Sequence, residues 1–202
     1  MFIVVDGPDG SGKDTLINHL RNHSDFYELV FGKRLFFDRE PSIEIKKIIT
    51  SEDCTPEEAM FYLFSDRNRK LNNNIGNIRN KDVLVIYNRF LPSTFAYQVR
   101  ASGVPESTMQ KRINLCDNFA YPDLTVILDA PVNVLMKRVS EYDKFERNAE
   151  FLAKVRDGYL KFRGSGFHKA LKYIDTESNT REQVISEFVL AVFEEMINPW
   201  GS

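Results

Sequence analysis

Five short apolar runs recur along the chain, at residues 2–5, 35–37, 83–87, 124–128 and 171–174. Each run is nearly continuous in apolar residues rather than alternating with polar ones, which is typical of strands that are buried on both faces. Stretches with the helical spacing of apolar residues separate the runs. Repeated strand–helix crossovers predict an α/β fold with a five-stranded parallel sheet and helices on both of its faces.

Two helices are expected between the second and third strands, over residues 42–51 and 56–73. The second begins with clear signals, because Thr55 is a good N-cap and Pro56 stands at the first helical position. Residues 72–80 contain five Asn and one Gly, a composition that is typical of a loop. We therefore expect the second helix to end near residue 73.

A glycine-rich turn links the first apolar run to a helical pattern that starts with Leu16. Glycines allow the backbone to turn its N–H groups inward, and the positive end of the following helix adds to the field. Lys13 then reaches the outer phosphates of a nucleotide as a compact positive charge. The setting of strand, loop and helix favours a phosphate-binding site over an ordinary glycine-rich turn. The candidate nucleotide-binding residues are Gly7, Asp9, Gly10, Ser11, Gly12, Lys13, Asp14 and Thr15.

One position of this loop departs from the usual pattern. Asp14 follows the lysine, where Ser or Thr normally supplies a hydroxyl for Mg²⁺, and Thr15 comes next. A carboxylate is a hard oxygen ligand that suits Mg²⁺ directly or through water, although it also brings negative charge close to the phosphates. Asp14 and Thr15 are therefore the candidate metal ligands, and the sequence leaves open whether Asp14 touches the metal.

The composition limits the classes of partner and compartment. A chain of 202 residues suits one α/β domain over residues 1–202, with a small lid. The formal net charge of −2 argues against a nucleic-acid binder with a broad basic surface. No apolar run approaches the ~20 residues needed to span a membrane. We expect no signal peptide, because the first predicted strand starts at Met1. Cys54 and Cys116 fit no zinc or CxxC spacing, so reduced thiols in the cytoplasm are expected.

Two arginines stand where predicted strands end. Arg39 follows the second strand, just before Pro41 turns the chain away, and Arg89 follows the third strand. Ligands gather at the carboxyl ends of parallel strands, so both guanidinium groups are placed to fork onto a phosphate. A surface ion pair is the alternative for each arginine, and it is less convincing for two arginines at adjacent strand ends.

Two later stretches carry candidate groups for a nucleobase and its sugar. Leu63 and Arg67 lie four residues apart on one helix face, so an apolar side chain can cover a base while the arginine donates to its carbonyl edge. Phe64 is an alternative platform, and both apolar residues also fit a simple core stripe. Polar residues after the third strand stand at the mouth of the expected acceptor pocket, although such residues also cap ordinary helices. These polar residues are Thr94, Tyr97 and Gln98.

Taken in order, these stretches resemble the thymidylate kinase family over nearly the whole chain. Many proteins share the glycine-rich loop, but Arg-Glu-Pro at 39–41, Ala-Tyr-Gln at 96–98 and Asp-Lys-Phe-Glu at 143–146 narrow the resemblance. The resemblance implies a P-loop NTPase fold and transfer of the γ-phosphate of ATP to a deoxynucleoside monophosphate, usually dTMP, with Mg²⁺. It also implies a homodimer that forms through helices flanking the sheet.

The resemblance implies where the substrates' phosphates and the adenine lie. Arg39 and Arg89 are expected to hold the acceptor phosphate, with Asp9 near the 3′-hydroxyl of the acceptor sugar. Arg138, which follows the fourth strand, is expected to stack on adenine. Asn88 stands where the family usually has Asp before this arginine, which removes a carboxylate expected near the acceptor and the metal.

For the acceptor base and sugar, the resemblance implies that Arg67 and Thr94 read the pyrimidine edge and that Tyr97 packs against the deoxyribose. Leu63 stands where an aromatic residue often stacks on thymine. We expect the loss of that ring to loosen base selection unless Phe64 takes over its function.

The lid expected near residues 140–148 is short and lacks the arginine–glycine segment that many relatives use to neutralise the transferring phosphate. Gly10 supplies no arginine from the loop either. Lys144 is the expected substitute, with Arg147 as the second candidate, so the candidate catalytic residues are Lys13, Arg89 and Lys144. A solvated charged turn is the alternative reading of the lid.

Three other functions stay open. A broader deoxynucleoside monophosphate kinase, accepting dUMP or others, is motivated by Leu63 and the short lid. A deoxynucleoside kinase shares the phosphate loop, but it acts on thymidine and does not depend on Arg39. A nucleotide-dependent switch or an inactive nucleotide-binding module is kept open by Asp14 and Asn88, although nothing in the chain resembles the Asn-Lys-x-Asp guanine signature.

Overall fold

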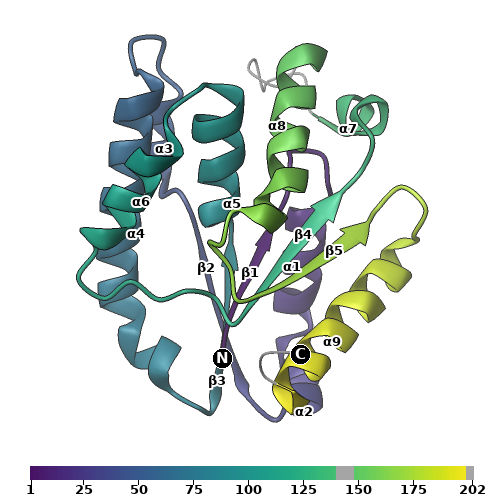
Figure 1. Cartoon of the computed structure of the whole chain (residues 1–202). Helices are drawn as coiled ribbons and strands as arrows, with labels where there is room; N and C mark the ends of the chain where they lie inside the picture. Colours follow the sequence, from purple (N-terminus) through teal and green to yellow (C-terminus); the bar gives the residue numbers. More distant parts are fainter. Residues whose placement is uncertain (140–147, 199–202) are drawn as a thin grey trace.

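The structure is a computed structural model that describes residues 1–139 and 148–198. A parallel five-stranded sheet forms its centre, with the strand order β2-β3-β1-β4-β5 (Figure 1). Each of the five apolar runs forms a strand, so this part of the prediction is confirmed. The strands are β1 (Phe2–Asp6), β2 (Arg34–Arg39), β3 (Val83–Asn88), β4 (Leu124–Asp129) and β5 (Ala170–Asp175).

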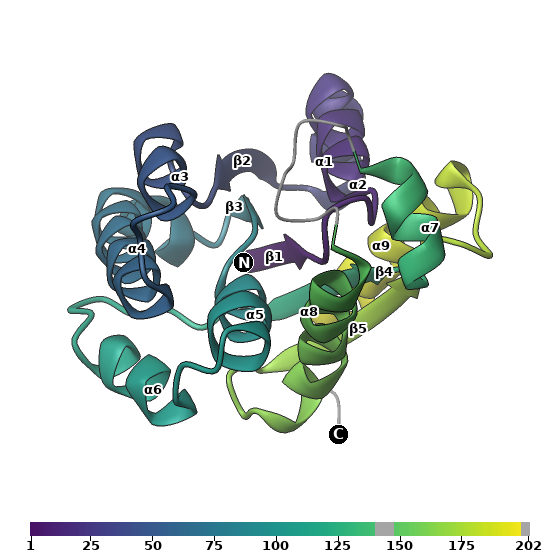
Figure 2. The same ribbon diagram turned by 90° about the horizontal axis from the view of Figure 1, so that it is seen from above.

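Helices cover both faces of the sheet, as predicted (Figure 2). One face carries α1 (Lys13–Asn22), α2 (Ser24–Phe31) and α9 (Arg181–Ile197). The other face carries α4 (Pro56–Arg79), α6 (Glu106–Asn114) and α8 (Ala149–Lys161). Shorter elements complete the described residues: α3 (Ile43–Ile49), α5 (Leu91–Thr94), the π-helix η1 (Phe95–Ala101), α7 (Val132–Arg138) and the 3₁₀ turn η2 (Phe162–Gly164).

The side chains of β1 explain why its sequence is continuously apolar. Ile3 and Val5 pack with the helices α1 and α9, whereas Phe2 and Val4 pack with α4 and α8 on the opposite face. Both sides of the central strand are therefore buried, as expected for a parallel sheet between two helical layers. No helix in the described part of the chain is long and apolar enough to cross a membrane.

The helix α4 corrects one prediction, because it continues through residues 72–79, most of the expected loop, and ends at Arg79. Its capping box at Thr55 and Glu58 agrees with the predicted start. The asparagines that suggested a loop are instead used in tertiary contacts. Asn74 donates to Asp38 Oδ2 at 2.7 Å and to the hydroxyl of Tyr87 at 2.8 Å. These distant partners outweigh the weak helical preference of Asn.

The topology places the ends of three neighbouring strands around one point. β1 lies between β3 and β4, so the loop after β1 emerges at the centre of the sheet. In the parallel register Val5 is opposite Asn88, and Asn88 is opposite Arg39. Residues that follow β1, β2 and β3 therefore meet at the carboxyl edge, where ligands of open α/β sheets bind.

Candidate active site

The loop between β1 and α1 has the backbone that a phosphate site requires. Gly7 has a φ of 148°, and a Cβ there would lie 2.2 Å from the carbonyl oxygen of Leu128, so only glycine fits. Gly12 caps α1 with a φ of 92° and has open space where a side chain would be. Backbone N–H groups at the start of α1 can therefore approach an anion closely.

Lys13, Asp9 and Arg89 form one charged cluster at the centre of the site. The side chain of Lys13 is only 2% exposed, and its Nζ donates to Asp9 Oδ1 at 2.6 Å and to the Pro8 carbonyl at 3.2 Å. Arg89 donates to the same oxygen of Asp9. The predicted donor cation and one predicted acceptor cation thus converge on a single point.

Arg39 stands at the rim of this cluster. It ends β2 in register with Asn88, and it is exposed. Lys70 donates to Asp38 Oδ1 at 3.0 Å and also to the Arg39 carbonyl, so the backbone beneath this side chain is well held. Its expected contact with an acceptor phosphate stays a prediction.

Asp14 and Asn88 form a pair that the sequence separates by 74 positions. The amide of Asn88 donates to Asp14 Oδ1 at 2.7 Å. Asn88 is 6% exposed, and its Oδ1 has no hydrogen-bond partner among the described residues. The carboxylate that the β3 end lacks is therefore supplied from α1, and the amide beside it fixes its position.

A buried carboxylate that the sequence analysis missed organises the turn carrying Arg89. Asp6 is fully buried, and its Oδ2 accepts from the backbone N–H groups of Phe90 at 2.9 Å and Ser93 at 3.1 Å. Its Oδ1 accepts from Gly7 N at 2.8 Å, Ser93 Oγ at 2.6 Å and the hydroxyl of Tyr159 at 2.9 Å. Through these hydrogen bonds one carboxylate connects the phosphate loop to the turn carrying Arg89 and to α8.

Arg89 itself adopts the left-handed backbone region, with a φ of 70°. A non-glycine residue in this region costs free energy and persists only where its surroundings determine it. The Asp6 contacts supply that support, and Arg89 Nη1 donates to Ser93 Oγ at 3.2 Å. The only sequence signal was a carboxylate at the end of the first strand, while nothing local marks Tyr159.

The Arg67 side chain is buried between two aromatic rings. Its guanidinium carbon lies 4.6 Å from the ring centroids of both Phe64 and Phe90. Arg67 Nη2 lies 2.8 Å from Glu40 Oε2 and donates to Thr94 Oγ1 at 3.2 Å. Its Nη1 and the Oε1 of Glu40 have no hydrogen-bond partner among the described residues.

Glu40 is the counter-ion that the sequence analysis did not identify. It is 2% exposed, and burial raises its pKa to about 7, against the opposing effect of the Arg67 guanidinium. Desolvation of a carboxylate favours its neutral form, while a nearby cation favours the charged form. Arg67 is therefore held as part of a buried ion pair, and its Nη1 is the guanidinium nitrogen left without a hydrogen-bond partner among the described residues.

Some of the other residues predicted to contact the acceptor pack in the core, and others contact Arg67 or Arg89. Leu63 is 8% exposed, and Phe64 belongs to the core cluster beside α4, so both also serve as core residues. Thr94 is fully buried and bonded to Arg67. Tyr97 lies under Arg89, with the guanidinium carbon 5.9 Å from its ring centroid, and Gln98 is partly buried in the π-helix η1.

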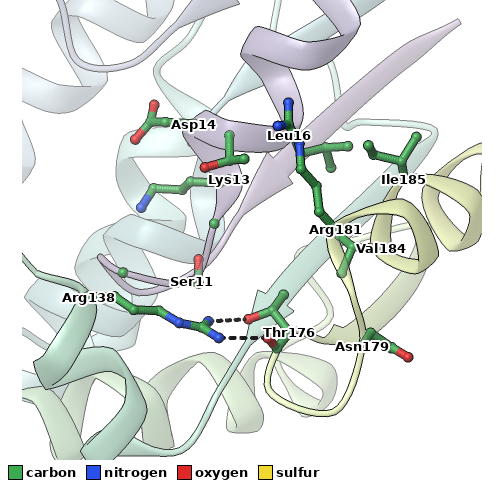
Figure 3. Close-up of a pocket in the computed structure, with 13 residues that line it drawn as sticks. Ser11, Lys13, Asp14, Leu16, Arg138, Thr176, Asn179, Arg181, Val184 and Ile185 are labelled. Atoms are coloured by element: carbon green, nitrogen blue, oxygen red, sulfur yellow. Dashed lines mark hydrogen bonds between the residues drawn. The ribbon is translucent and has the colours of Figure 1, made fainter.

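A cavity of about 470 Å³ lies beside the loop between β1 and α1 (Figure 3). The phosphate loop and the first turn of α1 line it, together with Arg138, Thr176 and the start of α9. Arg138 donates to Thr176 Oγ1 at 3.0 Å and to the Thr176 carbonyl at 2.9 Å, which fixes the guanidinium as a flat platform. Ser11, Asp14 and Thr15 all line this cavity, and their place beside a nucleotide stays a prediction.

The predicted lid residue Lys144 lies outside the described residues, as does most of the lid segment 140–148. The helix α8 is described from Ala149, after an N-cap at Asn148. Arg156 on α8 forms an ion pair of 2.7 Å with Asp129 at the end of β4, so α8 is joined to the cavity side of the sheet.

Comparison with known proteins decides the family. The profile of the thymidylate kinase family matches residues 5–187. The chain belongs to the thymidylate kinase family. A thymidylate kinase from Marinomonas sp. (strain MWYL1) is 29% identical over 198 residues, which cover 92% of this chain and 91% of that protein. A probable thymidylate kinase 1 from Saccharolobus solfataricus is 36% identical over 163 residues, covering 79% and 82% respectively.

The fold of the family is also recovered in three dimensions. The crystal structure of thymidylate kinase from Ehrlichia chaffeensis superposes with a TM-score of 0.72 at 24% identity, covering 97% of this chain and 98% of that one. The P-loop NTPase fold expected from the resemblance is therefore confirmed.

Proposed function

We propose that this member of the thymidylate kinase family transfers the γ-phosphate of ATP to dTMP, giving dTDP and ADP. The observation that carries the proposal is the convergence of Lys13 and Arg89 on one oxygen of Asp9. A donor-loop cation and an acceptor-side cation meet there, at the edge where β1 and β3 end. Two anionic substrates require such an arrangement to approach each other head to head.

The reaction needs alignment more than covalent participation by the protein. An oxygen of the dTMP phosphate attacks the γ-phosphorus of ATP, the bond to the β–γ bridging oxygen breaks, and ADP leaves. In the proposal, N–H groups of the loop and Lys13 hold the donor phosphates. Arg89 and Arg39 hold the acceptor phosphate, and Lys144 supplies the lid cation.

The acceptor base is assigned to the pocket around Arg67. Its remaining N–H group can donate to a carbonyl of the pyrimidine ring, with Thr94 beside it and the ring of Phe64 as an apolar wall. Tyr97 packs beside the deoxyribose, and Asp9 lies near its 3′-hydroxyl. Arg138 stacks on the adenine of ATP.

Mg²⁺, which the family implies, fits the residues at the loop. Asp14 offers an exposed carboxylate at the cavity, and hard oxygen donors of this kind are the ligands that Mg²⁺ prefers. Asn88, whose amide donates to Asp14, has an Oδ1 without a hydrogen-bond partner among the described residues. We assign Asp14 and the hydroxyl of Thr15 to hold the ion, directly or through water. Bound Mg²⁺ neutralises charge on the β- and γ-phosphates.

Exchanging the pair Asp14 and Asn88 tests this metal assignment. We expect Asp14→Asn to weaken Mn²⁺ binding to the enzyme–ADP complex by about tenfold, because the carboxylate is lost while the shape is kept. The reciprocal double variant Asp14→Asn with Asn88→Asp restores both the carboxylate and its amide partner. Titration by electron paramagnetic resonance measures Mn²⁺ binding without turnover. Equal Mn²⁺ affinity in the wild type and in Asp14→Asn would remove Asp14 from the metal site.

The assembly and compartment are proposed as the family implies: one domain with a lid near 140–148, a homodimer, and a cytoplasmic enzyme without nucleic-acid or membrane partners. Apolar side chains are exposed on helices that flank the sheet, including Ile43 on α3 and Phe61 on α4. Such side chains suit a contact between two copies.

A coupled assay for ADP tests the proposed function directly. The protein is supplied with ATP, Mg²⁺ and, in turn, dTMP, dUMP, dCMP, dGMP or thymidine. We expect ADP to form fastest with dTMP. Similar rates with all the monophosphates would favour the broader kinase, and activity on thymidine would favour a deoxynucleoside kinase. No ADP with any acceptor would leave a nucleotide-binding module.

A further inference from the structure

One cation beside the donor cavity has no part in the roles assigned so far. Arg181 is the first residue of α9, and it lines the cavity with Val184 and Ile185. Its side chain runs from α9 toward α1 and ends beside Leu16 (Figure 3). Within residues 1–139 and 148–198, no carboxylate lies within 4.0 Å of its guanidinium.

A histidine on α1 holds this guanidinium in place. Arg181 Nη2 lies 3.3 Å from His19 Nδ1, and a guanidinium can only donate, so Nδ1 accepts. The proton of the neutral ring is then on Nε2, which lies 3.1 Å from the hydroxyl of Tyr27 on α2. Burial, His23 and Arg181 all lower the pKa of His19, whereas Glu182 raises it, and the net shift keeps the ring neutral near pH 7.

The position of His19 places Arg181 beside the start of α1. Thr15 and His19 are four residues apart, so they share one face of the helix about one turn, ~5.4 Å, from each other. Thr15 lines the cavity in the first turn, where helix N–H groups attract phosphate. Arg181 therefore stands next to the site where an anion would dock.

The other cations of the cavity are already committed. Lys13 contacts Asp9, on the side where Arg89 also arrives, so it belongs to the transferring end of the phosphate chain. Both terminal nitrogens of Arg138 donate to Thr176, so this side chain offers its flat face to a base rather than N–H groups to a phosphate. Of the cations that line the cavity, Arg181 is the one left to bind the phosphate that is attached to the ribose.

We infer that Arg181 binds the α-phosphate of the donor nucleotide and that His19 is the positioning residue that orients it. The inference rests on the proposed ATP site, and it adds a cation from α9 to a phosphate chain otherwise bound by the loop and Lys13. The pair joins α1 to α9 across the open side of the cavity.

Equilibrium binding of ADP, AMP and adenosine tests the role of Arg181 without any turnover. We expect Arg181→Gln to weaken ADP and AMP by roughly three- to tenfold, the usual effect of one exposed charge-assisted hydrogen bond, and to leave adenosine unchanged. In steady-state assays KM for ATP should rise in parallel, while kcat and KM for dTMP stay the same. Arg21→Gln is the matched control, because that guanidinium lies over Phe37, 5.2 Å from the ring centroid, and does not line the cavity.

Two substitutions of His19 test its positioning role. His19→Leu removes the acceptor and should show part of the ADP defect, with no further loss when it is added to Arg181→Gln. His19→Asn offers an amide oxygen in place of Nδ1 and should recover wild-type affinity. Melting temperatures close to the wild type show that each variant is folded.

The results of these experiments can refute the roles of Arg181 and His19 independently of the proposed kinase activity. Unchanged ADP affinity in Arg181→Gln overturns the role of Arg181, and an equal loss for adenosine overturns the assignment to the phosphate. Wild-type ADP affinity in His19→Leu overturns the positioning role of His19. If the wild type binds ADP but does not phosphorylate dTMP, the proposed function fails while the binding data still decide the place of Arg181.

Discussion

Replacing Lys13 with Ala is expected to lower kcat for dTMP phosphorylation by about 10²–10³-fold, the usual cost of removing one preorganised charge from a transition state. Lys13 Nζ lies 2.6 Å from Asp9, which Arg89 also contacts, so in the proposed mechanism it stands where the transferring group passes. Neutralising that group electrostatically is most of what a phosphoryl-transfer enzyme does. Steady-state kinetics with ATP and dTMP measures the loss.

The control for this variant is Lys154→Ala on α8. Lys154 is an exposed lysine that forms an i,i+4 pair of 3.0 Å with Glu150, so its loss removes the same charge far from the loop. We expect Lys154→Ala to retain wild-type activity and both variants to melt close to the wild type. Near-normal turnover by folded Lys13→Ala would refute the assignment of the loop as the donor site.

Replacing Arg67 with Ala is expected to destabilise the protein by about 3–5 kcal/mol, because it leaves the Glu40 carboxyl group buried without its partner. Arg67 is 1% exposed and Glu40 is 2% exposed, so water cannot replace the lost contact. The melting temperature should fall by roughly 10 °C in a protein of this size. Loss of dTMP use in this variant alone therefore cannot distinguish base recognition from a damaged fold.

A double variant separates the two effects. Arg67→Met with Glu40→Leu removes both charges and keeps most of the buried volume, which commonly restores stability. We expect this variant to melt near the wild type, to bind ATP normally and to show a KM for dTMP raised by at least tenfold, about 1.4 kcal/mol of lost recognition. Recovery of wild-type dTMP use in the double variant would make Arg67 a purely structural residue.

The features that could be predicted from the sequence are those that depend on residues close together in the chain. Each strand is a short apolar run because both faces of the sheet are covered. The phosphate loop is likewise local, since Gly7, Gly12 and Lys13 lie within one turn between a strand and a helix. Arginines at strand ends could be placed because a parallel sheet brings those ends together.

The features that were missed depend on partners far apart in the chain. The loop predicted at 72–80 is helical because Asn74 bonds to Asp38, 36 positions away. Arg67 was predicted as a base contact, but its ion pair with Glu40 could not be seen in a local pattern. The sequence left the role of Asp14 open, and the structure places it beside Asn88.

The five hydrogen bonds that Asp6 accepts have a consequence for changing the enzyme's substrate range. One carboxylate sets the entry into the nucleotide loop and also the backbone that presents Arg89. Any substitution that shifts Asp6, Ser93 or Tyr159 moves both halves of the reaction centre together. Redesign of acceptor preference is therefore best confined to the residues around Arg67, where Arg67 and Glu40 can be replaced together without disturbing the contacts of Asp6.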